Sequence, residues 1–187
     1  MKFCSTCGQP VEFRIPPGDT RPRAVCTACG TVHYDNPRIV VGCVPEWQGR
    51  ILLCRRAIEP RRGYWTVPAG FMENGETLQA AAARETLEEA EARVAIGSLL
   101  SISHVLDAAQ VHISFRARLL DPAIAPGMES LEVALYDEGE IPWDEIAFPS
   151  ISFALHCYLE DRRQGVEVLH FSDIEPRQRD SKPQQRD

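Results

Sequence analysis

Three glutamates stand close together in the middle of the chain, at a spacing that would suit a bound cation. Glu85 precedes Glu88 and Glu89 by three and four residues, and residues at these spacings are neighbours on an α-helix. Two like charges 4 Å apart repel by about 1 kcal/mol in water and by about 4 kcal/mol at an effective dielectric constant near 20. A cation would offset that repulsion, and Mg²⁺ and Mn²⁺ prefer clustered carboxylates. The alternative is a solvated acidic face on a surface helix.

The residues that surround these glutamates favour a metal site. The stretch 70–92 resembles the signature motif of the Nudix hydrolases, in which a glycine, a glutamate and an Arg-Glu pair precede the last two glutamates at fixed spacings. The matching residues are Gly70, Glu76, Arg84, Glu85, Glu88 and Glu89, with Ala92 as the closing small apolar residue. Six positions in one register are very unlikely to match by chance.

Two positions depart from the motif. Thr86 replaces an aliphatic residue, which is a mild change, and Glu91 replaces a second glycine. A glycine at that point would end the helix in a left-handed cap. Without it, we expect the helix to continue to about Val94 and to end at Gly97. Counting 100° per residue, we also expect an apolar stripe to pack on the core; its residues are Ala80, Ala83, Leu87, Ala90 and Val94.

The Nudix resemblance implies hydrolysis of a phosphoanhydride bond in a nucleoside diphosphate linked to another group. A pyrophosphate carries dense charge, so its cleavage needs cations that neutralise oxygens and activate water. The resemblance implies that Glu85, Glu88 and Glu89 hold Mg²⁺ or Mn²⁺ and that the Gly70 carbonyl joins them. We expect Arg84 to pair with Glu76 and to tie the loop to the helix.

A second signal, which consists of cysteines, lies at the N-terminus. Two Cys-x2-Cys pairs, each followed by a glycine, are separated by eighteen residues; the cysteines are Cys4, Cys7, Cys26 and Cys29. This spacing is typical of a four-cysteine zinc ribbon. A segment of this size buries too little apolar surface to fold alone, so Zn²⁺ would supply folding energy. Disulfides or iron are the alternatives, and we favour zinc because only Met1, Lys2 and Phe3 precede the first cysteine and no secretory signal is expected.

The composition limits the remaining functions. The net charge of the 187 residues is −7, without a lysine- or arginine-rich run, which argues against a nucleic-acid partner. Apolar runs stay well below the ~20 residues that span a bilayer. We therefore expect a cytoplasmic protein. The Nudix resemblance implies a small nucleotide substrate, and we leave a homodimer open. The expected domains are a zinc ribbon at 1–35, a Nudix domain at 36–172 and a disordered tail at 173–187.

The pattern of the chain between these signals predicts alternating strands and helices. Expected strands cover residues 39–45, 51–56, 64–67, 102–106, 111–119, 131–136 and 166–171. Ser150 could cap a second helix that runs to about Arg163 and ends at Gly165. This agrees with an α+β fold, the Nudix α/β/α sandwich with a mixed sheet that the resemblance implies.

Several segments outside the motif resemble one branch of the family, the FAD pyrophosphatases of the plant chloroplast type and their bacterial relatives. They are the ribbon and the segments 36–43, 52–56, 65–70, 125–132, 141–144 and 158–161. The resemblance implies cleavage of FAD to FMN and AMP. ADP-ribose and NADH remain alternative substrates, although the Ser-Gln-Pro-Trp-Pro-Phe-Pro-like run of NADH pyrophosphatases does not occur in this chain.

Further residues are candidates for the site, and each has an alternative interpretation. Glu129 is the candidate for another metal ligand or general base, with Glu132 as its competitor, and either could be a plain surface acid. Arg55 and Arg56 alternate on a strand, so only one of them can face a phosphate. Trp65 could stack on a flavin or adenine ring, or equally belong to the core.

Two other classes of function compete with the enzyme. One is a zinc-ribbon binding module with an inactive Nudix domain, against which the intact glutamates argue. The other is a Nudix domain that regulates transcription, which the lack of a helix-turn-helix or basic segment disfavours.

Overall fold

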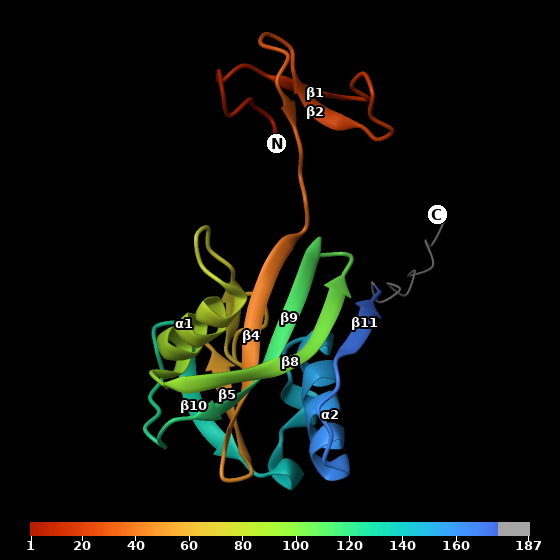
Figure 1. The fold of residues 1–187 in the computed structure, drawn as a ribbon. Coiled ribbons are helices and arrows are strands. Elements are labelled where there is room, and N and C mark those ends of the chain that lie inside the picture. Colours follow the sequence, from red (N-terminus) through yellow and green to blue (C-terminus); the bar gives the residue numbers. More distant parts are fainter. Residues whose placement is uncertain (176–187) are drawn as a thin grey trace, which may run out of the picture. The chain divides into compact units, whose positions relative to one another are not determined.

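The computed structural model describes residues 1–175, and these form two compact units, Met1–Pro37 and a unit that begins at Arg38 (Figure 1). The predicted tail at 173–187 lies outside the described residues from position 176 onward. Its first two residues, 173 and 174, belong to a strand instead. None of the helices in residues 1–175 combines the length and apolarity that crossing a bilayer demands.

The first unit is an antiparallel sheet in the order β1-β2-β3. Its strands are β1 (Val11–Arg14), β2 (Arg23–Cys26) and β3 (Val32–His33). Each pair of cysteines is followed by a glycine in the left-handed region, with φ angles of 74° at Gly8 and 73° at Gly30. Glycine adopts this conformation at little steric cost, so the two turns can fold tightly around the sulfur atoms.

The second unit contains, within the described residues, an eight-stranded mixed sheet. Six strands follow the order β10-β5-β4-β9-β8-β11, while β6 pairs with β5 and β7 with β4. The strands are β4 (Arg38–Trp47), β5 (Arg50–Arg56), β6 (Trp65–Thr66), β7 (Ala69–Phe71), β8 (Val94–Val105), β9 (Gln110–Leu119), β10 (Ser130–Tyr136) and β11 (His170–Ile174). β4 runs parallel to β9, and β11 runs parallel to β8.

Two α-helices of the described chain, α1 (Leu78–Ala90) and α2 (Pro149–Gln164), pack on this sheet. The short 3₁₀ turns η1 (Glu138–Glu140) and η2 (Trp143–Glu145) precede α2. Alternate residues of β4 face different helices, since Val41 packs with Ala82 of α1 whereas Val44 packs with Leu155 of α2. The mixed sheet between helices confirms the predicted α/β/α sandwich (Figure 1).

α1 buries a different face from the predicted stripe. Its buried residues are Ala81, Ala82, Glu85, Thr86, Glu89 and Ala90. Leu87 is 51% exposed and Ala80 is exposed, so the prediction that these two pack on the core is wrong. The small alanines instead let the helix approach Val41 and Phe115 closely. The side of α1 that carries Glu85 and Glu89 therefore turns inward.

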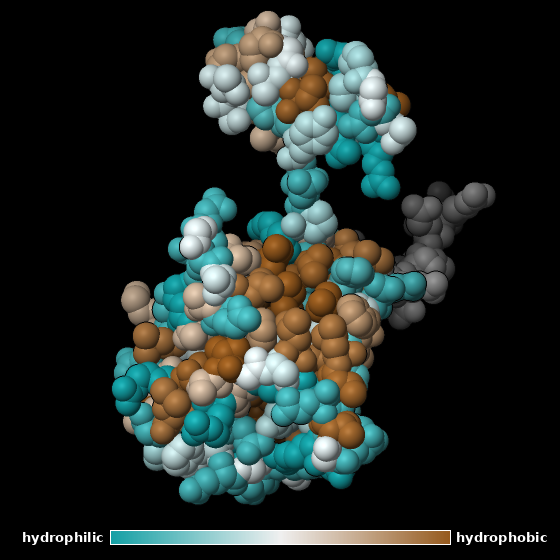
Figure 2. Space-filling view, viewed as in Figure 1, coloured by the Kyte–Doolittle hydropathy of each residue, from teal (hydrophilic) through white to brown (hydrophobic). Residues whose placement is uncertain are grey.

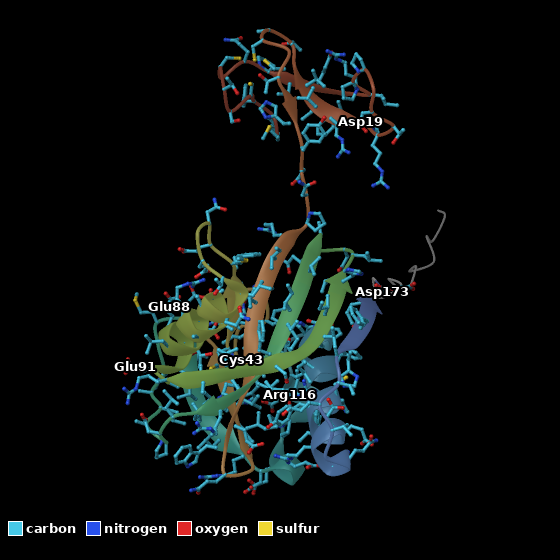
Figure 3. The ribbon with its side chains drawn as sticks, viewed as in Figure 1. Asp19, Cys43, Glu88, Glu91, Arg116 and Asp173 are labelled. Carbon is cyan, nitrogen blue, oxygen red and sulfur yellow. The ribbon has the colours of Figure 1, made fainter. Side chains whose placement is uncertain are left out.

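α1 also ends earlier than predicted. It stops at Ala90, and Glu91 forms a left-handed cap with φ 49° and ψ 24°, its N–H donating to the Leu87 carbonyl at 2.9 Å. Figure 3 shows Glu91 at this end of the helix. The predicted continuation to Val94 is wrong, because a glutamate accepts the left-handed conformation that the motif assigns to glycine. β8 begins at Val94 instead.

α2 ends as predicted but begins differently. Gly165 caps its C-terminus with φ 67°. The N-cap position is occupied by Phe148, and Pro149 is the first helical residue. The prediction that Ser150 caps the helix is therefore wrong. The Ser150 Oγ lies 3.0 Å from Nδ1 of His112 on β9 instead.

The segment that follows α2 is held by a buried ion pair. Arg116 of β9, labelled in Figure 3, donates to the Asp161 carboxylate and, at 2.9 Å, to the carbonyl of Val168. His170 Nε2 lies 3.0 Å from the same carboxylate. These contacts hold residues 166–169 outside the sheet, so the edge strand covers His170–Ile174 and not the predicted 166–171.

The strained cap leads to a stability prediction. Replacing Glu91 by Gly should stabilise the second unit by about 1 kcal/mol, because a non-glycine residue in the left-handed region costs of that order. The melting temperature should rise by about 2–4 °C. Glu91→Ala is the matched control, since it removes the charge but keeps the strain. An equal rise in both variants, measured by thermal unfolding, would attribute the effect to charge instead.

Candidate active site

A cleft of about 1860 Å³ opens between α1, the ends of β5 and β7, and the N-terminus of α2. The acids of α1 line one wall, and the loop that follows β5 lines another. Figure 2 shows the mixed apolar and polar surface of this unit from one side. Five residues of the motif line this space together with several others that the sequence did not single out; the five are Gly70, Arg84, Glu85, Glu88 and Glu89.

Glu85, Glu88 and Glu89 all line the cleft. Glu85 and Glu89 are only 8% and 6% exposed, whereas Glu88 lies on the outer side of α1 (Figure 3). Burial, reinforced by the charge of Glu85, raises the pKa of Glu89 to about 8. Burial also raises the pKa of Glu85, against the opposing effect of Arg84.

One oxygen of this group shows that the site fits a cation. Glu89 Oε2 is buried and finds no hydrogen-bond partner among residues 1–175. A buried carboxylate oxygen without a partner costs free energy, and its neighbour Glu85 adds repulsion. A hard divalent cation can be coordinated by such a set of oxygens, so the residues fit the Mg²⁺ or Mn²⁺ that the family motif implies.

Gly70 of β7 faces the acids at very short range. A Cβ atom at this position would lie 2.3 Å from Glu85 Oε2 and 2.4 Å from Oε1. Its φ is not in the left-handed region, so close approach and not conformational freedom explains the glycine. The backbone of β7 thereby borders the carboxylates directly.

Arg84 connects the loop before α1 to the acids. Its Nη2 donates to Glu76 Oε1 at 2.8 Å and to the Phe71 carbonyl at 3.2 Å, and its Nη1 donates to Glu85 Oε1 at 2.7 Å and Glu88 Oε2 at 3.0 Å. The arginine, helped by the backbone N–H of Glu73, lowers the pKa of Glu76 to about 2. Glu76 therefore stays ionised and holds the guanidinium in place. The predicted Arg84–Glu76 pair is present.

The structure separates Glu129 from its competitor. Glu129 lines the cleft, and its charge contributes to the raised pKa values of Glu85 and Glu89. Glu132 lies on β10 and pairs with Arg55 at 3.5 Å. The register of β10 against β5 shifts between Ser130 and Glu132. Such a bulge re-aims neighbouring side chains.

Arg55 and Arg56 take different roles. Arg56 lines the cleft, its guanidinium lies 5.1 Å from the centre of the Phe148 ring, and its charge opposes the rise in the pKa of Glu89. Arg55 donates instead to the Gly63 carbonyl at 2.9 Å and pairs with Glu132.

Trp65 does not reach the cleft. It is 5% exposed and packs edge-to-face on Tyr136 with ring centroids 5.2 Å apart. The stacking interpretation is corrected by this burial, and the core alternative holds.

Sequence reasoning missed several residues of the cleft. Tyr64, Trp143 and Phe148 contribute aromatic rings, and His112 contributes an imidazole 2.8 Å from Gln110 Oε1. Tyr64 directly follows the Pro-Arg-Arg-Gly loop, and an aromatic residue at the end of a loop is a signal for binding. His112 carries no such signal, because its position depends on the pairing of β9 with β4.

The four cysteines of the first unit also converge. Their sulfur atoms lie within 4.8 Å of one another, with Cys7–Cys26 at 3.4 Å, Cys7–Cys29 at 3.5 Å and Cys4–Cys29 at 3.8 Å. Four thiolates around Zn²⁺ at about 2.3 Å would lie about 3.8 Å apart. The donor set and its spacing therefore fit a tetrahedral zinc ion.

Comparisons with known proteins agree with both units. The NUDIX domain model matches residues 36–150, and the Nudix N-terminal zinc-ribbon model matches residues 2–35. A NUDIX hydrolase from Nitrosomonas europaea is 55% identical, with a TM-score of 0.91 over 94% of this chain and 100% of that one. An ADP-ribose pyrophosphatase from Streptococcus suis (18% identity, TM-score 0.59, 73% and 99% coverage) shares the fold.

A curated relative covers a smaller part. The NAD-capped RNA hydrolase NudC of Salmonella heidelberg is 40% identical over 95 residues, which make up 50% of this chain and 34% of that enzyme. The matched models together span the ribbon, the acidic helix and the sheet around them. On these grounds the chain belongs to the NUDIX domain family and carries the N-terminal zinc ribbon that occurs with it.

Proposed function

We propose that the protein hydrolyses the pyrophosphate bond of a nucleoside diphosphate derivative. The observation that carries this proposal is the buried Glu89 Oε2, which has no hydrogen-bond partner among residues 1–175. It lies beside Glu85 in a cleft that also contains the cationic side chain of Arg56. Negative groups gathered for a cation and a positive group nearby suit a substrate with a dense negative charge.

Each residue has an assigned part in this proposal. Glu85, Glu88, Glu89 and the Gly70 carbonyl would hold Mg²⁺ or Mn²⁺. The cation, when bound, neutralises phosphate oxygens and lowers the pKa of the attacking water. Arg84 keeps Glu85 and Glu88 oriented through its hydrogen bonds at 2.7 and 3.0 Å.

Glu129 and Arg56 act on the substrate side of the cleft. Glu129 would accept the proton of the attacking water, as its position near Glu85 and Glu89 allows. Arg56 would bind a phosphate oxygen, and Phe148 beneath it limits the directions in which the guanidinium can point. A guanidinium that could turn freely would hold the phosphate oxygen less precisely.

We propose FAD as the substrate, cleaved to FMN and AMP. The resemblance of the segments around Gly70 and Glu129 to the FAD-cleaving branch supports this choice. The cleft also supplies aromatic rings, among them Tyr64, Trp143 and Phe148, on which planar ring systems can stack. NADH is the second candidate, because NudC acts on NAD-capped RNA and is 40% identical over half of the chain. ADP-ribose shares the adenosine diphosphate half and remains a third.

The first test of this proposal concerns the cation. Glu89→Gln should weaken Mn²⁺ binding and lower kcat by at least ~100-fold, because even outer-shell partners of metal ligands are worth about 10- to 100-fold. Titration calorimetry and turnover assays measure the two effects. Glu91→Gln, at the C-cap of the same helix but outside the cleft, should leave both unchanged. Near-normal binding and turnover by Glu89→Gln would contradict the metal site.

The second test concerns zinc. The cysteine cluster should hold one Zn²⁺ per chain, and Cys26→Ser should lower both the zinc content and the melting temperature of the first unit, since bound metal contributes folding energy. Elemental analysis measures the content. Cys157→Ser, outside the cluster, is the control. Unchanged zinc content in Cys26→Ser would exclude the four-cysteine site.

The third test concerns the substrate and the bond that breaks. A panel of FAD, NADH and ADP-ribose should give FMN and AMP from FAD with the highest kcat/KM. Water should attack phosphorus, so that reaction in ¹⁸O water labels a phosphate group of FMN or AMP and no hydroxyl of riboflavin or adenosine. If FAD is inert while NADH or ADP-ribose turns over, the substrate is misassigned and the Nudix chemistry stands; if all three are inert with metal bound, the binding-module alternative gains support.

A further inference from the structure

The loop that carries Glu129 is fastened to the C-terminal end of α1. The Ala125 N–H donates to the Ala90 carbonyl at 2.9 Å, and the Gly127 N–H donates to the Glu89 carbonyl at 3.0 Å. The last carbonyls of an α-helix have no partner within the helix. The loop thus supplies donors to the helix turn that holds the cation-binding acids.

Gly127 leaves no space between the loop and the helix. A Cβ atom at this position would lie 1.7 Å from the Glu88 carbonyl oxygen and 2.8 Å from the Glu88 carbonyl carbon. The φ of Gly127 is outside the left-handed region, so a side chain is excluded by the helix backbone and not by its own conformation. The neighbouring atoms belong to the backbone of α1 and not to a flexible side chain, which limits how far they can move.

The other side of the loop is anchored to β5. The Glu129 carbonyl accepts the Ala57 N–H at 2.8 Å, one residue after Arg56, and the Ser130 N–H donates to the Gly127 carbonyl at 3.1 Å. Glu129 is therefore fixed between two supports. Its distance from the acids of α1 depends on how closely Gly127 approaches the helix.

We propose that Gly127 is a positioning residue, which sets the separation between the Glu129 carboxylate and the acids of α1. This rests on the proposed role of Glu129 as the group that receives the proton of water. A side chain at position 127 would push the loop away from α1 and carry Glu129 with it. A displacement of about 1 Å in a catalytic group can cost about 100-fold in rate.

Gly127→Ala tests the proposal. We expect kcat with FAD, or with whichever panel substrate turns over, to fall by about 10- to 100-fold, while KM and the Mn²⁺ affinity of the substrate-free protein change less than about threefold, because the ligands on α1 remain. Gly139→Ala is the matched control, since a Cβ there meets nothing within 4 Å. A Mn²⁺ affinity that collapses with kcat would overturn the proposal in favour of a distorted metal site.

A double-mutant cycle with Glu129→Gln separates positioning from general structural damage. If Gly127 acts through Glu129, the Gly127→Ala change should cost less than about twofold once Glu129 is Gln, because residues that act as a unit are not additive. Additive losses would overturn the positioning role and leave the proposed function intact. Normal kcat in Glu129→Gln alone would instead contradict the role of Glu129, and with it this inference.

Hydrogen exchange on the metal-free protein gives a readout apart from activity. The Ala125 and Gly127 amides should exchange slowly in the parent protein and faster in Gly127→Ala, with the amides of Ala82 and Thr86 inside α1 still protected. If Gly127→Ala does not fold, Ala125→Pro removes one donor without adding atoms at position 127 and enters the same cycle. Equal loss of protection throughout α1 would overturn the proposal.

Discussion

The repulsion between two buried carboxylates constrains the rest of the second unit. Glu85 and Glu89 are almost fully buried on one turn of α1, and their raised pKa values reflect this cost. Arg84 offsets the charge of Glu85, and Arg56 opposes the rise in the pKa of Glu89, but Glu89 Oε2 still has no hydrogen-bond partner among residues 1–175. A divalent cation bound there, as proposed, would offset this cost. Such a cation would also stabilise the folded second unit, because a ligand that binds only the folded state raises its stability.

The packing of α1 follows from that constraint. A helix that turns two acids inward can bury little apolar area on the same side, and α1 uses Ala81 and Ala82 to come close to the sheet. Leu87, the largest apolar residue in the middle of the helix, is left half exposed. The largest hydrophobic cluster of the described residues lies elsewhere, between α2 and the opposite face of the sheet, where Leu155 and Leu159 pack.

The sequence allowed much of this to be predicted where the information is local. The spacing of the cysteines predicted a cluster, the strand patterns predicted most of the sheet, and the motif predicted the Arg84–Glu76 pair. The predictions failed where distant residues decide. The helical periodicity of apolar residues does not reveal that α1 buries Glu85 and Glu89 and leaves Leu87 exposed. The burial of Trp65 likewise depends on Tyr136, which belongs to another strand. The end of α1 was misjudged because Glu91 adopts an unfavourable backbone conformation that no local pattern indicates.

The departure at Glu91 and the close contact at Gly127 belong to one arrangement at the end of α1. Three carbonyls of the last helical turn accept hydrogen bonds from backbone N–H groups outside the helix. The donors are Glu91, Ala125 and Gly127, and the acceptors are Leu87, Ala90 and Glu89, respectively. Two of the three come from a loop more than thirty positions along the chain, so the helix end does not depend on a glycine cap alone. A weaker local cap can be tolerated because the loop holds the same turn. The same hydrogen bonds bring Glu129 to the acids, and so the device that stabilises the helix end also determines the geometry of the cleft.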